Sequence, residues 1–222
     1  LGKFICVTGV SGSGKSTLAK ALAGHPDCKI TKGTIHFKNI DLLTLPVEER
    51  SNEGLFLGFQ YPIEIPGLSN SVFLKAAINA KNKYQKLNDV SATDFIKELK
   101  QKADMMGINQ SFLSRGVNEG YSGGEKKRNE ILQMLMLKPT LSVLDETDSG
   151  LDIDSMKIVS KGINSMLGED TSSIVITHYE RLLKYIKPDV VHVFHNGRII
   201  KSGDYMLARE LEEKGYEWLT NE

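Results

Sequence analysis

Short apolar runs recur along the chain, and most of them are separated by stretches with helical spacing. An apolar run of four to eight residues bounded by turn-forming residues is typical of a buried strand. Runs of this kind lie at residues 4–8, 55–60, 140–146, 173–177 and 190–195. Buried strands that alternate with helices are typical of a parallel sheet covered on both faces. The pattern therefore predicts an α/β protein.

A long helical block interrupts this alternation. The spacing is helical from Ser71, which is placed to cap a helix running to Tyr84, and a second helix follows. The residues on the apolar face of that second helix are Phe95, Leu99, Ala103 and Met106. We therefore expect residues 62–125 to form an all-helical subdomain inserted between two parts of one α/β core, residues 1–61 and 126–222.

Two stretches have the spacing of small antiparallel elements. Residues 33–38 alternate like a half-exposed strand, and residues 190–201 contain two strand-like runs around Asn196-Gly197. That dipeptide is typical of a tight hairpin turn. A helical pattern then runs from Asp204 to Leu219. Small antiparallel β elements are therefore expected beside the parallel core.

Composition excludes several classes of protein. The chain has 222 residues, with 28 Lys and Arg against 28 Asp and Glu, so no basic field favours nucleic acid or an anionic membrane. Two cysteines without ligand spacing indicate neither disulfides nor a metal cluster, and a reducing compartment fits them. No apolar run approaches the roughly 18 residues of a membrane span, so we expect a soluble protein without direct membrane insertion. Because Gly9 comes so early, we expect a single domain that lacks its most N-terminal segment.

The first apolar run leads directly into a glycine-rich phosphate-binding pattern, G-x-x-x-x-G-K-[ST]. The residues expected to bind the nucleotide here are Gly9, Ser11, Gly12, Ser13, Gly14, Lys15, Ser16 and Thr17. Backbone N–H groups of such a loop converge on phosphate oxygens, and glycines allow the close approach. Lys15 is expected to contact the β- and γ-phosphates of ATP, and the Ser16 hydroxyl to bind Mg²⁺. A chance match arises in about one in a hundred chains of this size, and the flanking strand and helix favour a RecA-like P-loop NTPase core instead.

Polar residues at the ends of three other apolar runs are the remaining catalytic candidates. Asp145 is expected to hold Mg²⁺ through its water shell, and Glu146 to orient or deprotonate the attacking water. A simple pair of turn carboxylates is the alternative, which the phosphate loop disfavours. Gln60 is either a contact to the metal or water near the phosphates or an ordinary surface glutamine. His178 is either a hydrogen-bond donor to the γ-phosphate or a structural histidine.

A second glycine turn precedes another helix. Its residues are Ser122, Gly123, Gly124 and Glu125, and they stand where a helix N-terminus presents free N–H groups. They are therefore candidates for a second anion site. The alternative is an ordinary capped helix with a solvated basic face at Lys126, Lys127 and Arg128. The isolated pattern leaves both interpretations open.

Taken in order, these motifs resemble those of the ABC ATPase nucleotide-binding domain over essentially the whole chain. The matching segments are the phosphate loop, Gln60, residues 122–125, residues 145–146, residues 149–152 and His178. The resemblance implies the ABC ATPase fold, with Gln60 as the Q-loop glutamine, residues 122–125 as the signature and His178 as the switch histidine. It also implies that two copies pair head to tail, so that each ATP lies between one phosphate loop and the other copy's signature.

The details of the motifs are similar to the branch of this family that serves SUF iron–sulfur cluster assembly. The similar stretches are residues 121–130, 145–152, 177–183, 185–189 and 211–219. This resemblance implies an ATP-hydrolysing motor with ATP and Mg²⁺ as ligands and SufB- and SufD-like proteins as partners, in a bacterial cytoplasm or a plastid stroma. The alternative is the ATPase subunit of an ABC membrane transporter. A DNA-repair, chromosome-organising or ribosome-binding ATPase is disfavoured, because the sequence has neither a long coiled-coil insertion nor a second such domain.

Overall fold

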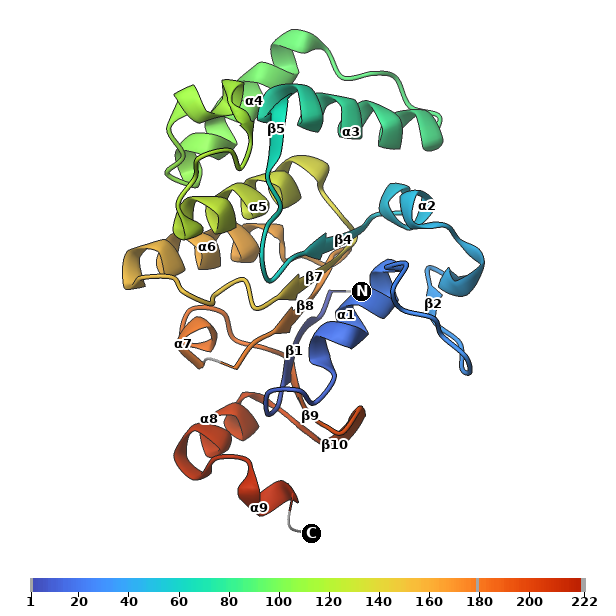
Figure 1. Cartoon of the computed structure of the whole chain (residues 1–222), viewed down its shortest axis with the longest axis vertical. Helices are drawn as coiled ribbons and strands as arrows, with labels where there is room; N and C mark the ends of the chain where they lie inside the picture. Colours follow the sequence, from blue (N-terminus) through green and yellow to red (C-terminus); the bar gives the residue numbers. More distant parts are fainter. Residues whose placement is uncertain (1, 179, 221–222) are drawn as a thin grey trace.

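A mostly parallel sheet forms the centre of the molecule (Figure 1). The computed structural model describes residues 2–178 and 180–220. Within this part of the chain the sheet has six strands in the order β10-β9-β1-β8-β7-β4. The strands are β1 (Phe4–Thr8), β4 (Leu55–Gly58), β7 (Leu141–Asp145), β8 (Ser172–Ile176), β9 (Val190–His195) and β10 (Arg198–Gly203). All neighbouring strands pair in parallel except β9 and β10, which form the predicted hairpin.

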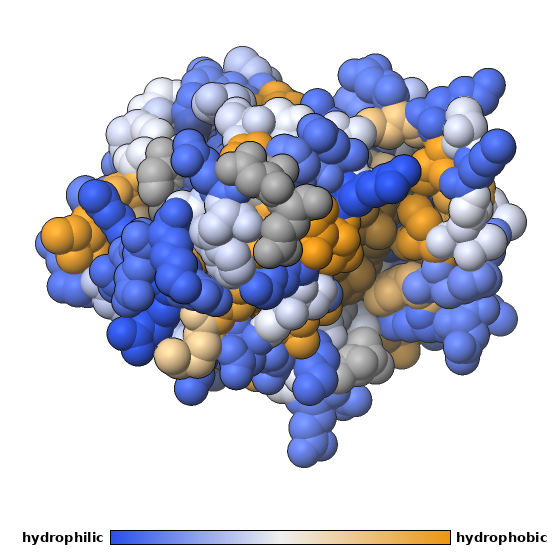
Figure 2. All heavy atoms as spheres, turned by 90° about the horizontal axis from the view of Figure 1, so that it is seen from below, coloured by the Kyte–Doolittle hydropathy of each residue, from blue (hydrophilic) through white to orange (hydrophobic). Residues whose placement is uncertain are grey.

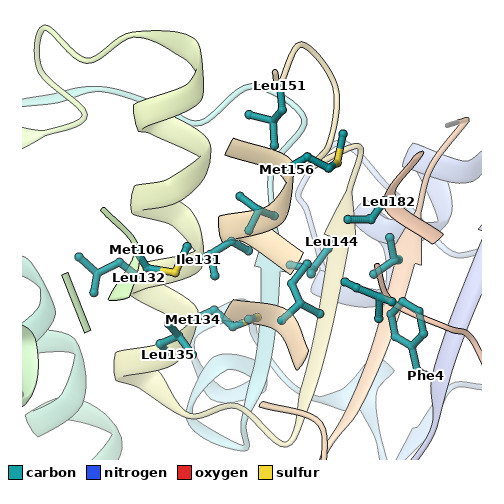
Figure 3. Packing of buried hydrophobic residues seen from close by; sticks show 14 of the residues in the cluster. Phe4, Met106, Ile131, Leu132, Met134, Leu135, Leu144, Leu151, Met156 and Leu182 are labelled. Atoms are coloured by element: carbon teal, nitrogen blue, oxygen red, sulfur yellow. The ribbon is translucent and has the colours of Figure 1, made fainter. Parts of the chain in front are cut away.

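Apolar layers cover both faces of the sheet, as a parallel sheet requires. Alternate residues of β1 enter different layers, because successive side chains of a strand point to opposite faces: Phe4 and Cys6 join one cluster and Val7 another. The first cluster packs α5 (Gly123–Leu137) and α6 (Ile153–Met166) against the strands, and Figure 3 shows Ile131 and Leu144 within it. In the second cluster, Ala19 of α1 (Lys15–Ala23) packs against the opposite face.

The segment between β4 and α5 is mainly helical. It contains α3 (Asn70–Tyr84), α4 (Ala92–Met105) and the 3-10 helix η2 (Gln110–Ser114). The predicted apolar face of α4 is buried, from Phe95 to Ala103. The segment is not purely helical, however, because β5 (Ile65–Ser69) pairs with β6 (Gly116–Val117) in an antiparallel ladder that brings its two ends together.

The start of α3 differs from the prediction. The capping residue is Ser69, whose hydroxyl accepts a hydrogen bond from the Val72 N–H, and not Ser71. The reason is that β5 ends at Ser69 with an extended backbone, which is the conformation that a capping residue needs. Ser71 therefore already lies in the first turn of the helix.

Smaller elements complete the chain. They are β2 (His36–Phe37), β3 (Ile40–Asp41), the 3-10 helix η1 (Leu42–Thr44), α2 (Val47–Asn52), α7 (Glu180–Leu183), α8 (Tyr205–Lys214) and α9 (Glu217–Thr220). The strand predicted at residues 33–38 is reduced to two residues, because Lys38 and Asn39 already turn the chain with positive φ angles and the partner strand β3 ends at Asp41, directly before η1. The end of the molecule that carries α8 and α9 has a largely hydrophilic surface with separate apolar groups (Figure 2). Among the described residues, no helix combines the length and the apolar character needed to cross a bilayer.

Candidate active site

The phosphate loop connects the carboxyl end of β1 to α1, at the sheet edge where α/β proteins bind ligands. Gly9 has φ +150°, and a Cβ added there would lie 2.1 Å from the carbonyl oxygen of Phe194 on β9. Gly14, the residue before α1, has φ +105°. Both positions therefore require glycine. Of the other predicted residues of this loop, Ser13 is buried, whereas Ser11, Gly12 and Thr17 are exposed.

Lys15 is folded back over its own loop. Its Nζ donates hydrogen bonds to the carbonyl oxygens of Gly9 and Val10, both at 2.9 Å, and contacts the Ser13 hydroxyl at 3.3 Å. The side chain is 4% exposed. Burial lowers the pKa of the ammonium group, and the nearby carboxylates of Glu146 and Asp145 oppose that shift. The ammonium group is thus held inside the loop by acceptors that phosphate oxygens can replace.

Ser16 and Asp145 lie together, although they are 129 residues apart in sequence. The Ser16 hydroxyl donates to Asp145 Oδ1 at 3.1 Å. Burial raises the pKa of Asp145, and the bond from Ser16 opposes this shift. A hydroxyl and a carboxylate are the hard oxygen ligands that Mg²⁺ takes beside phosphate groups. In the described part of the chain, no cluster of three or more His, Cys, Asp or Glu forms a separate metal site.

Glu146 contacts two of the other predicted catalytic residues, Gln60 and His178. One carboxylate oxygen accepts a hydrogen bond from Gln60 Nε2 at 2.7 Å, and the other lies 2.9 Å from His178 Nε2. The Glu146 N–H bonds to the Ile176 carbonyl, which extends the pairing of β7 with β8 by one residue. Glu146 has φ +49°, and a non-glycine residue in this region is often part of a functional site. The fold therefore joins residues from the ends of β4, β7 and β8 at one carboxylate.

Lys127 of α5 is a functional candidate that the sequence did not reveal. One of the two interpretations of this stretch places it on a solvated basic face, but it is 5% exposed. Its Nζ donates to the carbonyl oxygens of Phe59 at 2.9 Å, Gln60 at 2.6 Å and Glu146 at 3.2 Å. Lys127 thus fixes the backbone beside two of the catalytic candidates. The apolar positions of α5 at residues 131 and 134 gave a signal, because one helical face includes them and residue 127.

Glu130 lies one helical turn after Lys127, and it also binds the backbone of the segment that follows β4. Its Oε1 accepts a hydrogen bond from the Phe59 N–H at 2.7 Å. Burial raises the pKa of Glu130 to about 7, although Lys127 and the Phe59 N–H oppose the shift. The two residues of α5 therefore hold both polar groups of the Phe59 backbone.

Asp148 is a second candidate that was missed. One of its carboxylate oxygens accepts a hydrogen bond of 2.6 Å from the Thr177 hydroxyl, directly before His178. Burial raises the pKa of Asp148 to about 6, and the Thr177 bond opposes the shift. The pair ties the turn after β7 to the end of β8. No sequence pattern signals it, because residues 148 and 177 become neighbours only when these strands pair.

In the described part of the chain, the side chains of the glycine turn at the start of α5 form no hydrogen bond with this group of residues. The Ser122 hydroxyl caps the Glu125 N–H, and the Glu125 carboxylate accepts a bond of 2.7 Å from the Ser122 N–H. This reciprocal pair is a capping box. Ser122 and Gly123 are exposed, so the N-terminus of α5 is accessible from solution. The helix cap expected in one interpretation is therefore present, and the anion site stays a prediction.

Comparison with known proteins identifies the family. Residues 1–149 match the sequence model of the ABC transporter family. The chain belongs to this family. As a member of the ABC family the chain is an ATPase, which confirms the activity predicted from the phosphate loop and the two carboxylates.

Curated relatives match nearly the whole ABC chain. The "Probable ATP-dependent transporter SufC" of Escherichia coli K12 is 51% identical, over 100% of this chain and 89% of the relative. The "Iron-sulfur cluster assembly protein SufC" of Plasmodium falciparum is 50% identical, over 97% of this chain and 62% of the relative. The "Probable ATP-dependent transporter ycf16" of Trieres chinensis is 55% identical, over 98% and 87%. The predicted resemblance to the SUF branch is thereby confirmed.

Solved structures confirm the fold of the ABC chain. An ATP-binding subunit of an ABC transporter has a TM-score of 0.79 at 22% identity, covering 99% of this chain and 88% of that one. A dimeric ATP-binding cassette bound to ADP and Pi has a TM-score of 0.77 at 20% identity, covering 92% and 86%. The predicted ABC-type α/β fold is therefore correct.

Proposed function

We propose that this ABC ATPase is a SufC-type motor for iron–sulfur cluster assembly. The observation that carries the proposal is its identity of 50 to 51%, over nearly its full length, to proteins named SufC in E. coli and P. falciparum. The geometry around Glu146 supports the chemical part of the proposal, because a carboxylate held on two sides suits a residue that must orient water.

In the proposed reaction, the phosphates of ATP bind the backbone N–H groups of the loop, and Lys15 exchanges its carbonyl acceptors for phosphate oxygens. Water attacks the γ-phosphorus in line, the bond to the β-phosphate oxygen breaks, and ADP leaves. Glu146 orients this water and accepts its proton. Gln60 and His178 hold the carboxylate, and His178 also donates to the γ-phosphate. The contacts of 2.7 and 2.9 Å at Glu146 support these proposed roles.

Magnesium is the metal that we propose for this site. Ser16 and Asp145 would hold it, with Asp145 acting through a water molecule, and the side-chain oxygen of Gln60 is the third candidate. The Ser16–Asp145 pair supports this assignment, because its two oxygens already lie 3.1 Å apart. When bound, Mg²⁺ neutralises charge on the β- and γ-phosphates.

A second copy of the chain is proposed to complete the site. Residues 122–125 would bind the γ-phosphate of ATP held in the other copy's phosphate loop. The exposed N-terminus of α5 supports this role, because free N–H groups at a helix N-terminus favour anions. ATP would then draw two copies together, and hydrolysis would release them.

The partners that we propose are SufB- and SufD-like proteins, in a bacterial cytoplasm or a plastid stroma. Within the chain, residues 62–125 are proposed to form the subdomain that moves relative to residues 1–61 and 126–222. The ATPase subunit of an ABC membrane transporter is the second candidate, because relatives such as ycf16 are named probable ATP-dependent transporters. The two candidates share the chemistry and differ in the partner.

The chemical part is tested with Glu146→Gln, which keeps the shape of the side chain and removes its charge. We expect ATP binding to persist, kcat to fall by about 10²- to 10⁴-fold, and an ATP-dependent dimer to accumulate in gel filtration. Glu210→Gln is the matched control, because Glu210 lies on α8 and forms an ion pair with Lys214, a residue outside the proposed site. Normal turnover by Glu146→Gln would refute the role of Glu146.

The biological part is tested by affinity capture from native aqueous and detergent-solubilised extracts, with and without ATP. Mass spectrometry should identify SufB- and SufD-like proteins in the aqueous extract. Recovery of a membrane protein with several spans would instead support the transporter and leave the catalytic assignments unchanged.

A further inference from the structure

The C-terminal end of the described chain contacts the base of the phosphate loop. Tyr216 lies in the short link between α8 and α9, near the end of the molecule where α8 and α9 flank the β9–β10 hairpin (Figure 1). Its hydroxyl lies 2.5 Å from the Thr8 hydroxyl. Thr8 is the last residue of β1 and directly precedes Gly9. A residue 208 positions away thus bonds to the residue on which the phosphate loop begins.

The same tyrosine shares the lining of a small cavity with His178. This cavity of about 10 Å³ is lined by Thr8, Thr177, His178 and Tyr216, with Leu183, Ala208 and Leu211 forming its apolar walls. Its size is close to that of a single water molecule. Tyr216 and His178 therefore border one space, and Thr8 connects that space to the phosphate loop.

The link that carries Tyr216 is held in place from several sides. Gly215 ends α8 with φ +70°, and its N–H bonds to the Leu211 carbonyl. The Trp218 indole N–H donates to the Gly215 carbonyl at 2.9 Å. The ammonium groups of Lys201 and Lys214 lie 4.2 and 5.4 Å from the centre of the Trp218 ring, within the range of cation–π attraction. The tyrosine ring is therefore presented by an ordered turn.

We propose that Tyr216 is a positioning residue for ATP hydrolysis, which fixes His178 relative to the start of the phosphate loop through its hydroxyl bond to Thr8. Thr8 is 7% exposed, so bulk water cannot readily take the place of the Tyr216 hydroxyl as its hydrogen-bond partner. Without the Tyr216 hydroxyl, the cavity beside His178 enlarges and Thr8 loses this side-chain bond, whereas the pairing of β1 with β8 and β9 still holds the base of the loop. This inference rests on the role proposed for His178 at the γ-phosphate.

The kinetic test is Tyr216→Phe, which keeps the ring and removes only the hydroxyl. Because nucleotide binding depends on the loop and Lys15, we expect KM for ATP and the affinity for ADP to stay within twofold. We expect kcat to fall about fivefold, the effect of losing one neutral hydrogen bond. Thr8→Val should reproduce the loss, and the double variant should be no worse than either single variant. Tyr205→Phe, at the start of the helix that precedes Tyr216, is the matched control and should behave as wild type.

A spectroscopic test separates positioning from general loosening of the fold. The imidazole ¹H–¹³C signal of His178 is assigned by its disappearance in His178→Ala. Tyr216→Phe should move this signal, and Tyr205→Phe should leave it unchanged. A kcat loss without movement of the His178 signal, or an unchanged kcat, would overturn the proposal.

The tests also separate this inference from the proposed function. If His178→Ala hydrolyses ATP normally, the role of His178 at the γ-phosphate fails, whatever Tyr216 does. If His178→Ala is impaired while Tyr216→Phe is normal in both assays, the histidine keeps its role and only the inference about Tyr216 is wrong.

Discussion

Replacing Lys127 by methionine tests how the site is supported. Methionine keeps most of the length of the side chain and removes the charge. The change deletes three hydrogen bonds at once, to the carbonyl oxygens of Phe59, Gln60 and Glu146. It also removes the positive charge that opposes the raised pKa of Glu130. Both stability and activity should therefore fall.

The size of the stability loss follows from these contacts. Removing one partner of a buried charged network costs about 3–5 kcal/mol, because the remaining groups stay desolvated. Protonation of Glu130 limits this cost, so we expect about 3 kcal/mol at pH 7.5. At pH 5.5 the carboxyl with its pKa of about 7 is already mostly neutral in the native wild type. The loss should therefore be about 1 kcal/mol smaller at pH 5.5 than at pH 7.5.

Urea unfolding at both pH values measures the stability loss, with Lys126→Met as the matched control. Lys126 is the preceding residue, 24% exposed, and pairs with Glu64 at the surface. Its loss should cost less than about 1 kcal/mol. In ATPase assays Lys127→Met should lower kcat at least tenfold, because Gln60 and Glu146 lose a common anchor, while ADP affinity stays unchanged. Equal effects of the two variants would refute the supporting role of Lys127.

Three further predictions concern the phosphate loop and the buried carboxyl. Lys15→Ala should lose most of its nucleotide affinity in fluorescence titrations, and unchanged affinity for ATP would contradict the phosphate-binding role. Gly9→Ala should be destabilised by more than about 3 kcal/mol in thermal unfolding, because its Cβ would lie 2.1 Å from the Phe194 carbonyl oxygen. The pKa of Glu130 is raised from 4.5 to about 7 in the native state. Between these two pH values the native protein keeps a proton that the unfolded chain has already lost, so stability declines as pH rises through that window. Urea unfolding should show wild type losing about 3 kcal/mol relative to Glu130→Gln between pH 4.5 and 7.5; parallel curves would show that the pKa of Glu130 is not raised.

The sequence was sufficient for most of the fold and for the expectation that several of the candidate site residues lie together. Strand periodicity and the glycine pattern are local properties, so the strands of the parallel core and the phosphate loop were predictable. The carboxyl ends of parallel strands share one edge, which is why Glu146 and His178 were expected together. Local signals were insufficient where two residues competed for one role, as with Ser69 and Ser71 at the start of α3.

Only the tertiary structure decided which polar residues are buried and what they contact. Lys127 belongs to a run of basic residues that is typical of a solvated face, yet it bonds to carbonyls up to 68 residues away. Tyr216 reaches Thr8 across 208 residues, because α8 packs against β9, the neighbour of β1 in the sheet. Such contacts depend on how complete layers pack on the sheet. Hydrophobic periodicity specifies the layers, but the partners of a buried charge or hydroxyl are fixed only when those layers meet.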